Sequence, residues 1–386
     1  MKAIELFAGA GGLGMGVSQA GFNPVKIVEW DRWCCDTINL NREARVAPVA
    51  NWPAPYLGDI RPVDFKEFEG KIDLVTGGPP CQPFSMGGKH RAFDDTRDMW
   101  PEAVRVVRET MPKAFIFENV KGMKRAAFAT YFSYIELQLH HPAIERRTGE
   151  DWVAHFGRLQ QHHTSKKDIE PEYRVVANVL NAADYGVPQR RERVVFVGFR
   201  STLGIPWKFP EGQFSMDALL WDVCRSGTYW DRHQVPLLAR DLDCRLENRA
   251  MSLRGKPTSK GWRTVRDAIS DLPEPSLAPS SCVRNHRLQA GARSYHGHTG
   301  SPLDLPAKTL KAGVHGVPGG ENMLVNADGS VRYFTVRESA RLQTFPDSYE
   351  LQGSWSEAMR QLGNAVPVEL ARVIAKDVAV HLRKAA

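Results

Sequence analysis

The chain has 386 residues, of which 42% are hydrophobic and 25% charged, and it carries a formal net charge of +7 at pH 7. This length predicts two to three domains, and the composition is typical of a globular protein, which excludes collagen, coiled coils and wholly disordered chains. No apolar run approaches the roughly 18 residues of a membrane span, and no signal-peptide pattern is present, so we expect a cytoplasmic protein.

The first two hundred residues alternate short apolar segments with glycine- and proline-rich turns and longer mixed segments. This pattern is typical of βαβ units and predicts an α/β domain with a doubly wound, mostly parallel sheet. The expected strands are residues 3–7, 25–30, 72–76, 114–118, 174–181 and 194–199. Helical spacing predicts helices over residues 13–20, 33–39 and 99–109.

From about residue 201 to residue 331 the alternation gives way to prolines, glycines and scattered Trp, His and Arg, which predicts a smaller, irregular, loop-rich domain. Basic residues gather at 240–266 around Trp262, although a solvated basic surface explains them equally well. Regular structure resumes at Thr335, and a helix is expected over 367–383. For residues 140–171, rich in His, Arg and Glu, we expect only a surface helix and loop.

A candidate cofactor loop follows the first predicted strand, where Gly9, Gly11 and Gly14 form the pattern GxGxxG before a predicted helix. Such a turn lets a cofactor approach the backbone at a helix N-terminus. Glu29 ends the second strand, where a carboxylate can accept hydrogen bonds from both ribose hydroxyls of an adenosine group, and Trp30 offers a flat face to adenine. This pattern does not separate a nicotinamide dinucleotide from S-adenosylmethionine.

A further carboxylate, Asp59, lies in the segment Gly58-Asp59-Ile60 and could accept from an adenine amino group. Each of these residues also has an ordinary explanation, as a turn glycine, a solvated carboxylate or a core tryptophan. The interpretation therefore depends on their combination.

Cys81 stands in the segment GGPPCQPFS, directly after the predicted strand 72–76. Two glycines and three prolines exclude helix and central strand, so we expect the thiol on a stiff loop at the carboxyl end of a strand, where open α/β sheets bind ligands. A lone Cys is more often inert, but a place beside a cofactor pocket favours a nucleophile. The six cysteines show no CxxC spacing, so neither a disulfide framework nor a metal site is expected.

Two polar segments are expected near the same edge. Glu118 and Asn119 end the fourth strand, and a buried Glu beside an electron-rich heterocycle can act as an acid. The segment QRRER at 189–193 supplies guanidinium groups suited to a phosphate or a base carbonyl. A cap or salt-bridge partner and an ion-paired strand entry are the respective alternatives.

Together these motifs resemble the C5-cytosine DNA methyltransferases of bacterial or phage type. In chain order they are LFAGAGG (6–12), VEWD (28–31), GDI (58–60), GGPPCQPFS (77–85), FENV (117–120), QRRERV (189–194), RESARLQTFP (337–346) and QLGNAVP (361–367). One departure is Glu5, where the family usually has Asp; the carboxylate is preserved.

The resemblance implies a Rossmann-like methyltransferase domain in residues 1–200, a target-recognition domain that reads DNA sequence in 201–331, and a return segment, 332–386, that completes the first domain. The implied cofactor-binding residues are Phe7, Gly9, Ala10, Gly11, Gly12, Leu13, Glu29, Trp30, Asp59, Ile60, Pro79, Asn364 and Val366. The implied catalytic residues are Cys81, Glu118, Arg193, Pro80, Asn119 and Arg191. The implied DNA contacts are Gln82, Ser85, Lys89, Arg91 and Thr309.

The implied reaction transfers a methyl group from S-adenosylmethionine to C5 of a flipped-out cytosine in a specific double-stranded DNA sequence, leaving S-adenosylhomocysteine. Attack of Cys81 on C6, with Glu118 at N3 and Arg193 at O2, would activate C5. Residues 87–91 would form a closing loop. A restriction endonuclease acting on the same site is a possible partner, and a monomer that associates with the nucleoid, without membrane contact, is expected.

Four alternatives differ in what they leave unexplained. An RNA cytosine methyltransferase is the main one, against which the long basic insertion of 201–331 favours a duplex reader. An amino-group methyltransferase would need an aromatic residue in place of Cys81. A nicotinamide oxidoreductase leaves Cys81, Glu118 and Arg193 without a role, and the presence of all three disfavours a non-catalytic binding protein. The DNA sequence that is recognised stays open.

Overall fold

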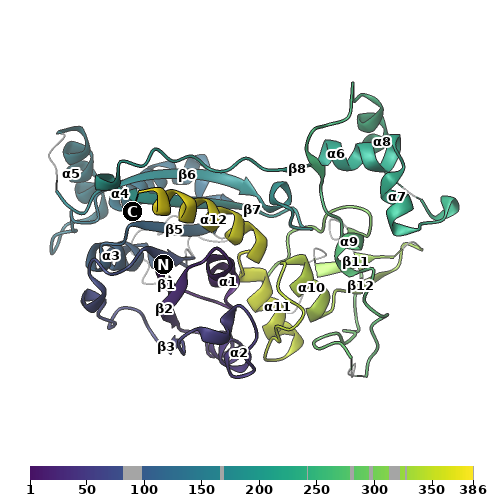
Figure 1. The fold of residues 1–386 in the computed structure, drawn as a ribbon, viewed down its shortest axis with the longest axis horizontal. Helices are drawn as coiled ribbons and strands as arrows, with labels where there is room; N and C mark the ends of the chain where they lie inside the picture. Colours follow the sequence, from purple (N-terminus) through teal and green to yellow (C-terminus); the bar gives the residue numbers. More distant parts are fainter. Residues whose placement is uncertain are drawn as a thin grey trace. The chain divides into compact units, whose positions relative to one another are not determined.

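The computed structural model describes residues 1–80, 98–165, 169–240, 242–278, 282–294, 299–312, 322–326 and 328–385. They form two compact units (Figure 1). The first unit comprises Met1–Leu180, Glu192–Pro210 and Ala371–Ala386, and the second comprises Asn181–Arg191 and Glu211–Leu370.

A seven-stranded sheet organises the first unit, with the strand order β3-β2-β1-β4-β5-β7-β6. The strands are β1 (Lys2–Leu6), β2 (Asn23–Glu29), β3 (Tyr56–Leu57), β4 (Leu74–Gly77), β5 (Ala114–Val120), β6 (Tyr173–Asn181) and β7 (Glu192–Arg200). Strands β1 to β5 pair in parallel, and β7 runs antiparallel to β5. The chain moves outward in one direction from β1 to β3 and in the other from β4, so the predicted doubly wound, mostly parallel α/β fold is confirmed.

The predicted strands are all present, with ends that differ by at most two residues from those expected. The helices of this unit are α1 (Gly12–Gln19), α2 (Arg32–Glu43), α3 (Trp100–Thr110), α4 (Ala129–His140), α5 (Trp152–Ser165) and most of α12 (Val368–Lys384). The two-residue edge strand β3 was not predicted, because so short a segment shows no period. Among the described residues, no helix is long and apolar enough to cross a membrane.

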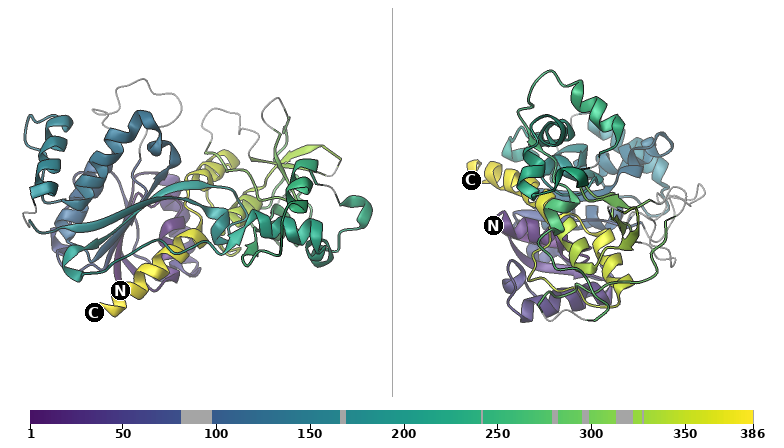
Figure 2. Two further views of the ribbon diagram at one scale, coloured as in Figure 1. Left: turned by 90° about the horizontal axis from the view of Figure 1, so that it is seen from above. Right: turned by 90° about the vertical axis from the view of Figure 1, so that its right-hand side faces the viewer.

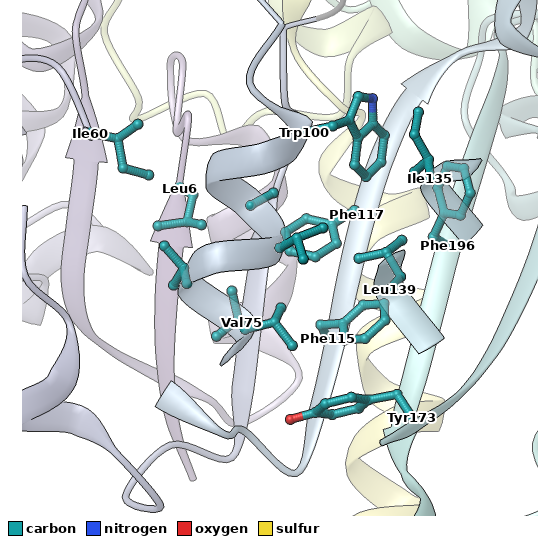
Figure 3. Close-up of a cluster of buried hydrophobic side chains, with 14 of the residues drawn as sticks. Leu6, Ile60, Val75, Trp100, Phe115, Phe117, Ile135, Leu139, Tyr173 and Phe196 are labelled. Carbon is teal, nitrogen blue, oxygen red and sulfur yellow. The ribbon is translucent and has the colours of Figure 1, made fainter. Parts of the chain in front are cut away.

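The main apolar core lies where α3 and α4 cover one face of the sheet (Figure 3). Phe115 and Phe117 on β5 and Phe196 on β7 point to this face because alternate residues of a strand share a side. Trp100 at the start of α3 packs edge-on against Phe196, with ring centroids 5.1 Å apart. Aromatic pairs of this geometry contribute about 0.5–1.5 kcal/mol beyond the area that they bury.

Helix α12 covers the opposite face of this sheet, where Figure 2 shows it as the yellow helix. Its His381 ring contacts Phe199 of β7, with centroids 6.4 Å apart. Asp377 accepts a hydrogen bond of 2.6 Å from the indole nitrogen of Trp207. These contacts attach the end of the chain to the unit that its beginning forms.

The second unit is built from short elements around two small apolar clusters. Its helices are α6 (Met216–Leu220), α7 (Thr228–His233), α8 (Cys244–Met251), α9 (Val265–Ile269), α10 (Val336–Leu342) and α11 (Trp355–Asn364). Its strands are β8 (Phe214–Ser215), β9 (Lys260–Gly261), β10 (Ser301–Pro302), β11 (Met323–Val325) and β12 (Val331–Tyr333). The irregular character expected for this region agrees with elements of two to ten residues.

The compact units divide the chain differently from the expected boundaries at 200 and 331, because residues 332–370 belong to the second unit. Their contacts give the reason. The Arg337 guanidinium, fully buried, donates to the carbonyl of Arg284, and Asn285 exchanges two hydrogen bonds with the backbone of Leu351. Only the part of α12 from Ala371 onward returns to the first unit. The DNA-reading role expected for 201–331 stays a prediction.

We expect Gly198→Ala to destabilise the protein, because a Cβ atom there would lie 2.2 Å from the Phe115 ring on the neighbouring strand. Overpacking of this kind costs about 1–3 kcal/mol. Gly157→Ala is the control, since nothing lies within 4 Å of its Cβ position in α5 and helical Gly→Ala changes are stabilising. Urea unfolding should separate the two variants, and equal stabilities would contradict the packing described here.

Candidate active site

The site is built at the carboxyl ends of β1, β2, β4 and β5, beside the point where the strand order reverses. The turn after β1 has an unusual backbone: Phe7 has a φ of 53°, Gly9 of 54° and Gly11 of 85°. The left-handed region costs a non-glycine residue about 1 kcal/mol or more, so Phe7 is held there by its surroundings. Backbone strain of this kind is concentrated at functional sites.

Gly11 is the N-cap of α1 and has no side chain with which to accept from the first-turn N–H groups. The amino end of a helix carries partial positive charge, and its unpaired N–H groups suit an electron-rich ligand. Ala10, Gly12 and Leu13, also expected in this pocket, are buried. A cofactor at this turn would therefore contact the backbone of these residues and not their side chains.

Glu29 ends β2 with its carboxylate buried against this turn. One oxygen accepts from the Gly9 N–H at 2.7 Å, and the other accepts from the N–H groups of Trp30 at 2.9 Å and Asp31 at 2.8 Å. Burial raises the pKa of the Glu29 carboxyl, and the three backbone donors oppose this change. The glutamate thus joins the end of β2 to the glycine turn after β1.

Two further expected cofactor residues are neighbours of Glu29: Trp30 follows it in the chain, and Asp59 belongs to the segment paired with it across the sheet. The Trp30 side chain is 78% exposed, which is unusual for so large an aromatic ring, while its backbone N–H donates to the Glu29 carboxylate. The Gly58 N–H donates to the carbonyl of Glu29 at 3.0 Å, which brings the segment of Asp59 to the same edge. Asp59 is exposed and pairs with Arg61, and Ile60 is buried.

The carbonyl of Pro79 accepts a hydrogen bond of 2.8 Å from the Asn119 side-chain amide. The Asn119 oxygen in turn accepts from the N–H of Val120, so the amide is fixed at both ends. Gly78 lies so close to Glu118 that a Cβ on it would be 3.4 Å from the carboxylate. The end of β5 therefore positions the chain that leads into Cys81.

Glu118 and Arg193 form an ion pair across the antiparallel β5 and β7, with the Arg193 Nε 2.7 Å from a Glu118 oxygen. Both side chains are largely buried. Burial lowers the pKa of Arg193, and the Glu118 carboxylate opposes this change. The sequence expectation that these two residues share a site is thus met in the geometry, although their catalytic roles remain predictions.

The expected nucleophile Cys81 and the expected DNA contacts Gln82, Ser85, Lys89 and Arg91 lie outside the described residues, as does the expected closing loop. The description of this segment ends at Pro80 and resumes after residue 97. The Met99 N–H donates to the Pro80 carbonyl at 3.4 Å.

Arg191 lies in the second unit and is fully buried. Its guanidinium donates to the carbonyls of Leu310 at 3.0 Å, Gly363 at 2.6 Å and Ala365 at 2.9 Å. A catalytic effect of Arg191 would therefore act through these two backbone segments, near residues 310 and 364, and not through contact with a base. Thr309, the expected DNA contact, donates its hydroxyl to the carbonyl of Arg190 at 2.6 Å.

Two buried glutamines complete this network and were not singled out from the sequence. Gln189 accepts from the Leu310 N–H at 2.9 Å and donates to the Leu342 carbonyl at 3.2 Å, while Gln343 donates to the carbonyl of Leu362. Both stand inside recognised motifs, QRRERV and RLQTFP, which was the available signal. Two residues expected at the cofactor also belong to this unit: Asn364 is the last residue of α11, and Val366 lies between α11 and α12. Their role stays a prediction.

The doubly wound sheet, the glycine turn with its buried glutamate and the polar groups at the strand ends define an α/β enzyme of the Rossmann-like class. The chain matches the family described as C-5 cytosine-specific DNA methylase over residues 1–141 and 159–379. It belongs to that family and is a DNA cytosine-5 methyltransferase. The unmatched residues 142–158 include the start of α5.

Curated relatives are similar in sequence to this protein over nearly its whole length. The Type II methyltransferase M.PspPI of Psychrobacter sp. (strain TA137) is 33% identical over 97% of this chain and 78% of its own length. M.NgoMIV of Neisseria gonorrhoeae is 29% identical over 99% of this chain and 98% of its own length. M.Eco47II of Escherichia coli is 31% identical over 98% of this chain and 78% of its own length.

Solved structures support the fold. A putative DNA modification methyltransferase encoded within a prophage (E. coli) superposes with a TM-score of 0.58 at 19% identity, covering 99% of both chains. The S. pombe Dnmt2 methyltransferase superposes with a TM-score of 0.57 at 17% identity, covering 100% of this chain and 99% of the other.

Asn119→Ala should lower kcat for DNA methylation about 10- to 100-fold, because losing the bond to Pro79 lets the chain before Cys81 shift, and small misplacements are costly in catalysis. Asn178→Ala is a matched control. The Asn178 oxygen also accepts from the next N–H at 2.8 Å, but it lies exposed on β6. Steady-state kinetics with unchanged thermal stability would test this, and equal kcat values for the two variants would contradict it.

Proposed function

We propose that this enzyme transfers a methyl group from S-adenosylmethionine to C5 of a flipped-out cytosine in a specific short double-stranded DNA sequence, through a covalent bond from Cys81 to cytosine C6. The observation that carries the proposal is the Glu118–Arg193 ion pair beside the Gly78–Pro80 segment. It places a carboxyl group and a guanidinium donor beside Gly78, three residues before Cys81 in the chain.

The residues present fit S-adenosylmethionine. Of the roughly four acceptor sites of the Glu29 carboxylate, three are taken by backbone donors, and the remaining site would take a ribose hydroxyl. The exposed Trp30 face would stack on adenine, Asp59 would accept from its amino group, and the uncapped start of α1 would border the methionine part. When bound, the cofactor supplies an electrophilic methyl group on a sulfonium.

The protein residues would perform the remaining chemistry. The Cys81 thiolate adds to C6, while Glu118 supports protonation at N3 and Arg193 donates to O2, so that electron density moves to C5. After C5 takes the methyl group, loss of the C5 proton and elimination of the thiolate restore the aromatic ring. The target base must leave the helix first, because C6 is inaccessible within a stacked duplex.

A groove in the second unit supports the DNA-reading role proposed for residues 201–331. It has a volume of about 620 Å³, and its cationic lining residues are Arg232, Lys256, Lys260 and Arg263. Asp222 and Asp267 are its acids, and Asp267 is already bound by Arg232 and His233. Aromatic walls beside exposed cations suit a nucleic-acid backbone.

We further propose that the enzyme is a monomer, that it is cytoplasmic and associates with the nucleoid, and that a restriction endonuclease cuts the same sequence. The family and its Type II relatives support a DNA substrate. The monomeric state can be tested with the purified protein.

Expression in a host without cytosine methylation, followed by bisulfite sequencing, tests the reaction and its specificity. We expect protected cytosines within one short sequence, and none with Cys81→Ser, because the serine hydroxyl is a far weaker nucleophile than the thiolate. Protection of host RNA in place of DNA would move the activity to the RNA alternative. Equal DNA protection by the serine variant would exclude the covalent mechanism.

The triple variant Lys256→Ala, Lys260→Ala, Arg263→Ala should bind duplex DNA more weakly and lose salt dependence. Each phosphate contact contributes about 0.9 to the slope of log K against log salt concentration, so the slope should fall by up to about 3. Lys2→Ala is the control, because Lys2 is the first residue of β1 and lies at the opposite end of that strand from the candidate active site. Fluorescence anisotropy across a salt series measures both, and an unchanged slope in the triple variant would remove the groove from the DNA interface.

A further inference from the structure

Glu5 is a buried carboxyl group that the proposed reaction does not use. It lies in the middle of β1 and is 2% exposed, and its neighbours in the sheet are Ile27 on β2 and Thr76 on β4. Its side chain points to the sheet face under α1, opposite to Ile4 and Leu6 in the main core. It directly precedes the LFAGAGG motif, at the position where the chain departs from the family pattern with Glu in place of Asp.

Helix α1 packs directly on this carboxyl group. A Cβ on Gly14, the third glycine of the GxGxxG pattern, would lie 3.3 Å from the Glu5 carboxyl carbon and 2.9 Å from the Trp52 ring. Only a glycine permits this approach, so Glu5 occupies the space between the sheet and the helix that begins at the cofactor turn. Trp52 is itself fixed by a 2.9 Å hydrogen bond from its indole to Ser18 of the same helix.

The hydrogen bonds around Glu5 are better satisfied when its carboxyl group carries a proton. The Thr76 hydroxyl contacts both a Glu5 oxygen and the Ile4 carbonyl, the latter at 3.4 Å. A hydroxyl has one proton, so it can donate to only one of these acceptors. If Glu5 is protonated, it donates to the Thr76 oxygen while Thr76 donates to Ile4, and both contacts become hydrogen bonds.

The surroundings of Glu5 also favour the neutral form. Its second oxygen, Oε1, is buried and accepts no well-formed hydrogen bond from the described residues. The described residues that oppose or pack against it, Ile27, Thr76, Gly14 and Trp52, carry neither a charge nor a titratable group. Burial accordingly raises the pKa of Glu5 to about 8, with hydrogen bonds from Thr76 and the Gly14 N–H opposing the change.

We propose that Glu5 is a positioning residue that, as a neutral acid, joins the cofactor helix α1 to the end of β4 and so sets the cofactor turn against the strand that leads to the nucleophile. Thr76 directly precedes Gly77-Gly78-Pro79-Pro80, and Gly14 lies in the first turn of α1. The glutamate reaches both because it is one methylene longer than aspartate. This inference rests on the proposed binding of S-adenosylmethionine at the turn after β1.

Calorimetric titration with S-adenosylhomocysteine between pH 6.5 and 9.5 tests the role in binding without a catalytic readout. In the wild type, Kd should rise at least about fivefold from pH 7 to pH 9.5 as Glu5 ionises. Glu5→Gln, which keeps the length and neutrality, should bind within twofold of the wild type at pH 7 and lack this additional rise. The ligand's own ionisation affects both proteins equally. Glu5→Asp should raise Kd about tenfold with kcat changed less than threefold.

A hydroxyl-deletion pair gives the matched control. Thr76→Val should raise Kd, whereas Thr110→Val should not, since Thr110 is equally buried but its hydroxyl donates to the Val106 carbonyl within its own helix, α3. Identical pH profiles for the wild type and Glu5→Gln would overturn the inference, as would a tenfold loss of affinity in Glu5→Gln at pH 7. Absence of binding by the wild type at every pH would overturn this inference and the proposed cofactor together.

Thermal unfolding gives a second readout that needs no ligand. Because the pKa of Glu5 is raised in the folded protein, the folded state holds a proton that the unfolded state releases above about pH 4.5. Stability from this group is therefore lost as the pH rises toward about 8. The wild type should lose Tm relative to Glu5→Gln between pH 5 and pH 8.5, and a constant difference in Tm would contradict a neutral Glu5.

Discussion

The pairing of Glu118 with Arg193 is the interaction on which the catalytic part of the structure depends. A buried carboxylate without a partner would be costly, and an isolated buried guanidinium equally so, whereas the pair offsets part of both desolvation penalties. The antiparallel β7 makes the pair possible, because it brings the start of its own strand to the end of β5. A wholly parallel sheet would have placed these residues at opposite edges.

The end of β5 presents a polar side chain on each face of the sheet, because neighbouring residues of a strand point in opposite directions. Glu118 faces the ion pair and Gly78, while Asn119 holds the Pro79 carbonyl. The cofactor edge is organised in the same way, since Glu29 binds the N–H groups of its own turn and of the Gly9 turn. Glu29 and Asn119 are thus fixed by hydrogen bonds with the backbone, and Glu118 by Arg193, before any ligand binds, which reduces the entropic cost of binding.

The sequence alone was sufficient for the strands, and for placing the candidate site residues of the first unit at strand ends, because these features depend on local patterns. Apolar runs between glycine and proline turns define β1 to β7 except the two-residue β3, and the motifs lie at strand ends where ligands bind. The interpretation of Glu29 as a ribose acceptor did not anticipate its bonds to three backbone N–H groups, since the fold of the turn determines them.

What could not be predicted depends on contacts between distant segments. Arg191 was grouped with Arg193 because they are two residues apart, yet one is tethered to carbonyls near 310 and 364 and the other to Glu118. Residues 332–370 join the second unit through contacts with residues 284–285 that no local pattern reveals. The basic groove combines residues from 214 to 267, and its position follows from the packing of short helices without clear periodicity.

The central claim is that Cys81 bonds to cytosine C6 before the methyl group is transferred, and the most direct measurement is a trapping experiment. Duplex DNA with 5-fluorocytosine at the recognised position has no C5 proton to lose, so the last step is blocked after methylation. The account predicts a covalent protein–DNA adduct that survives denaturation, requires S-adenosylmethionine and maps to Cys81 by peptide mass spectrometry. Full methylation of ordinary DNA by an enzyme that forms no such adduct, or an adduct at another residue, would contradict it.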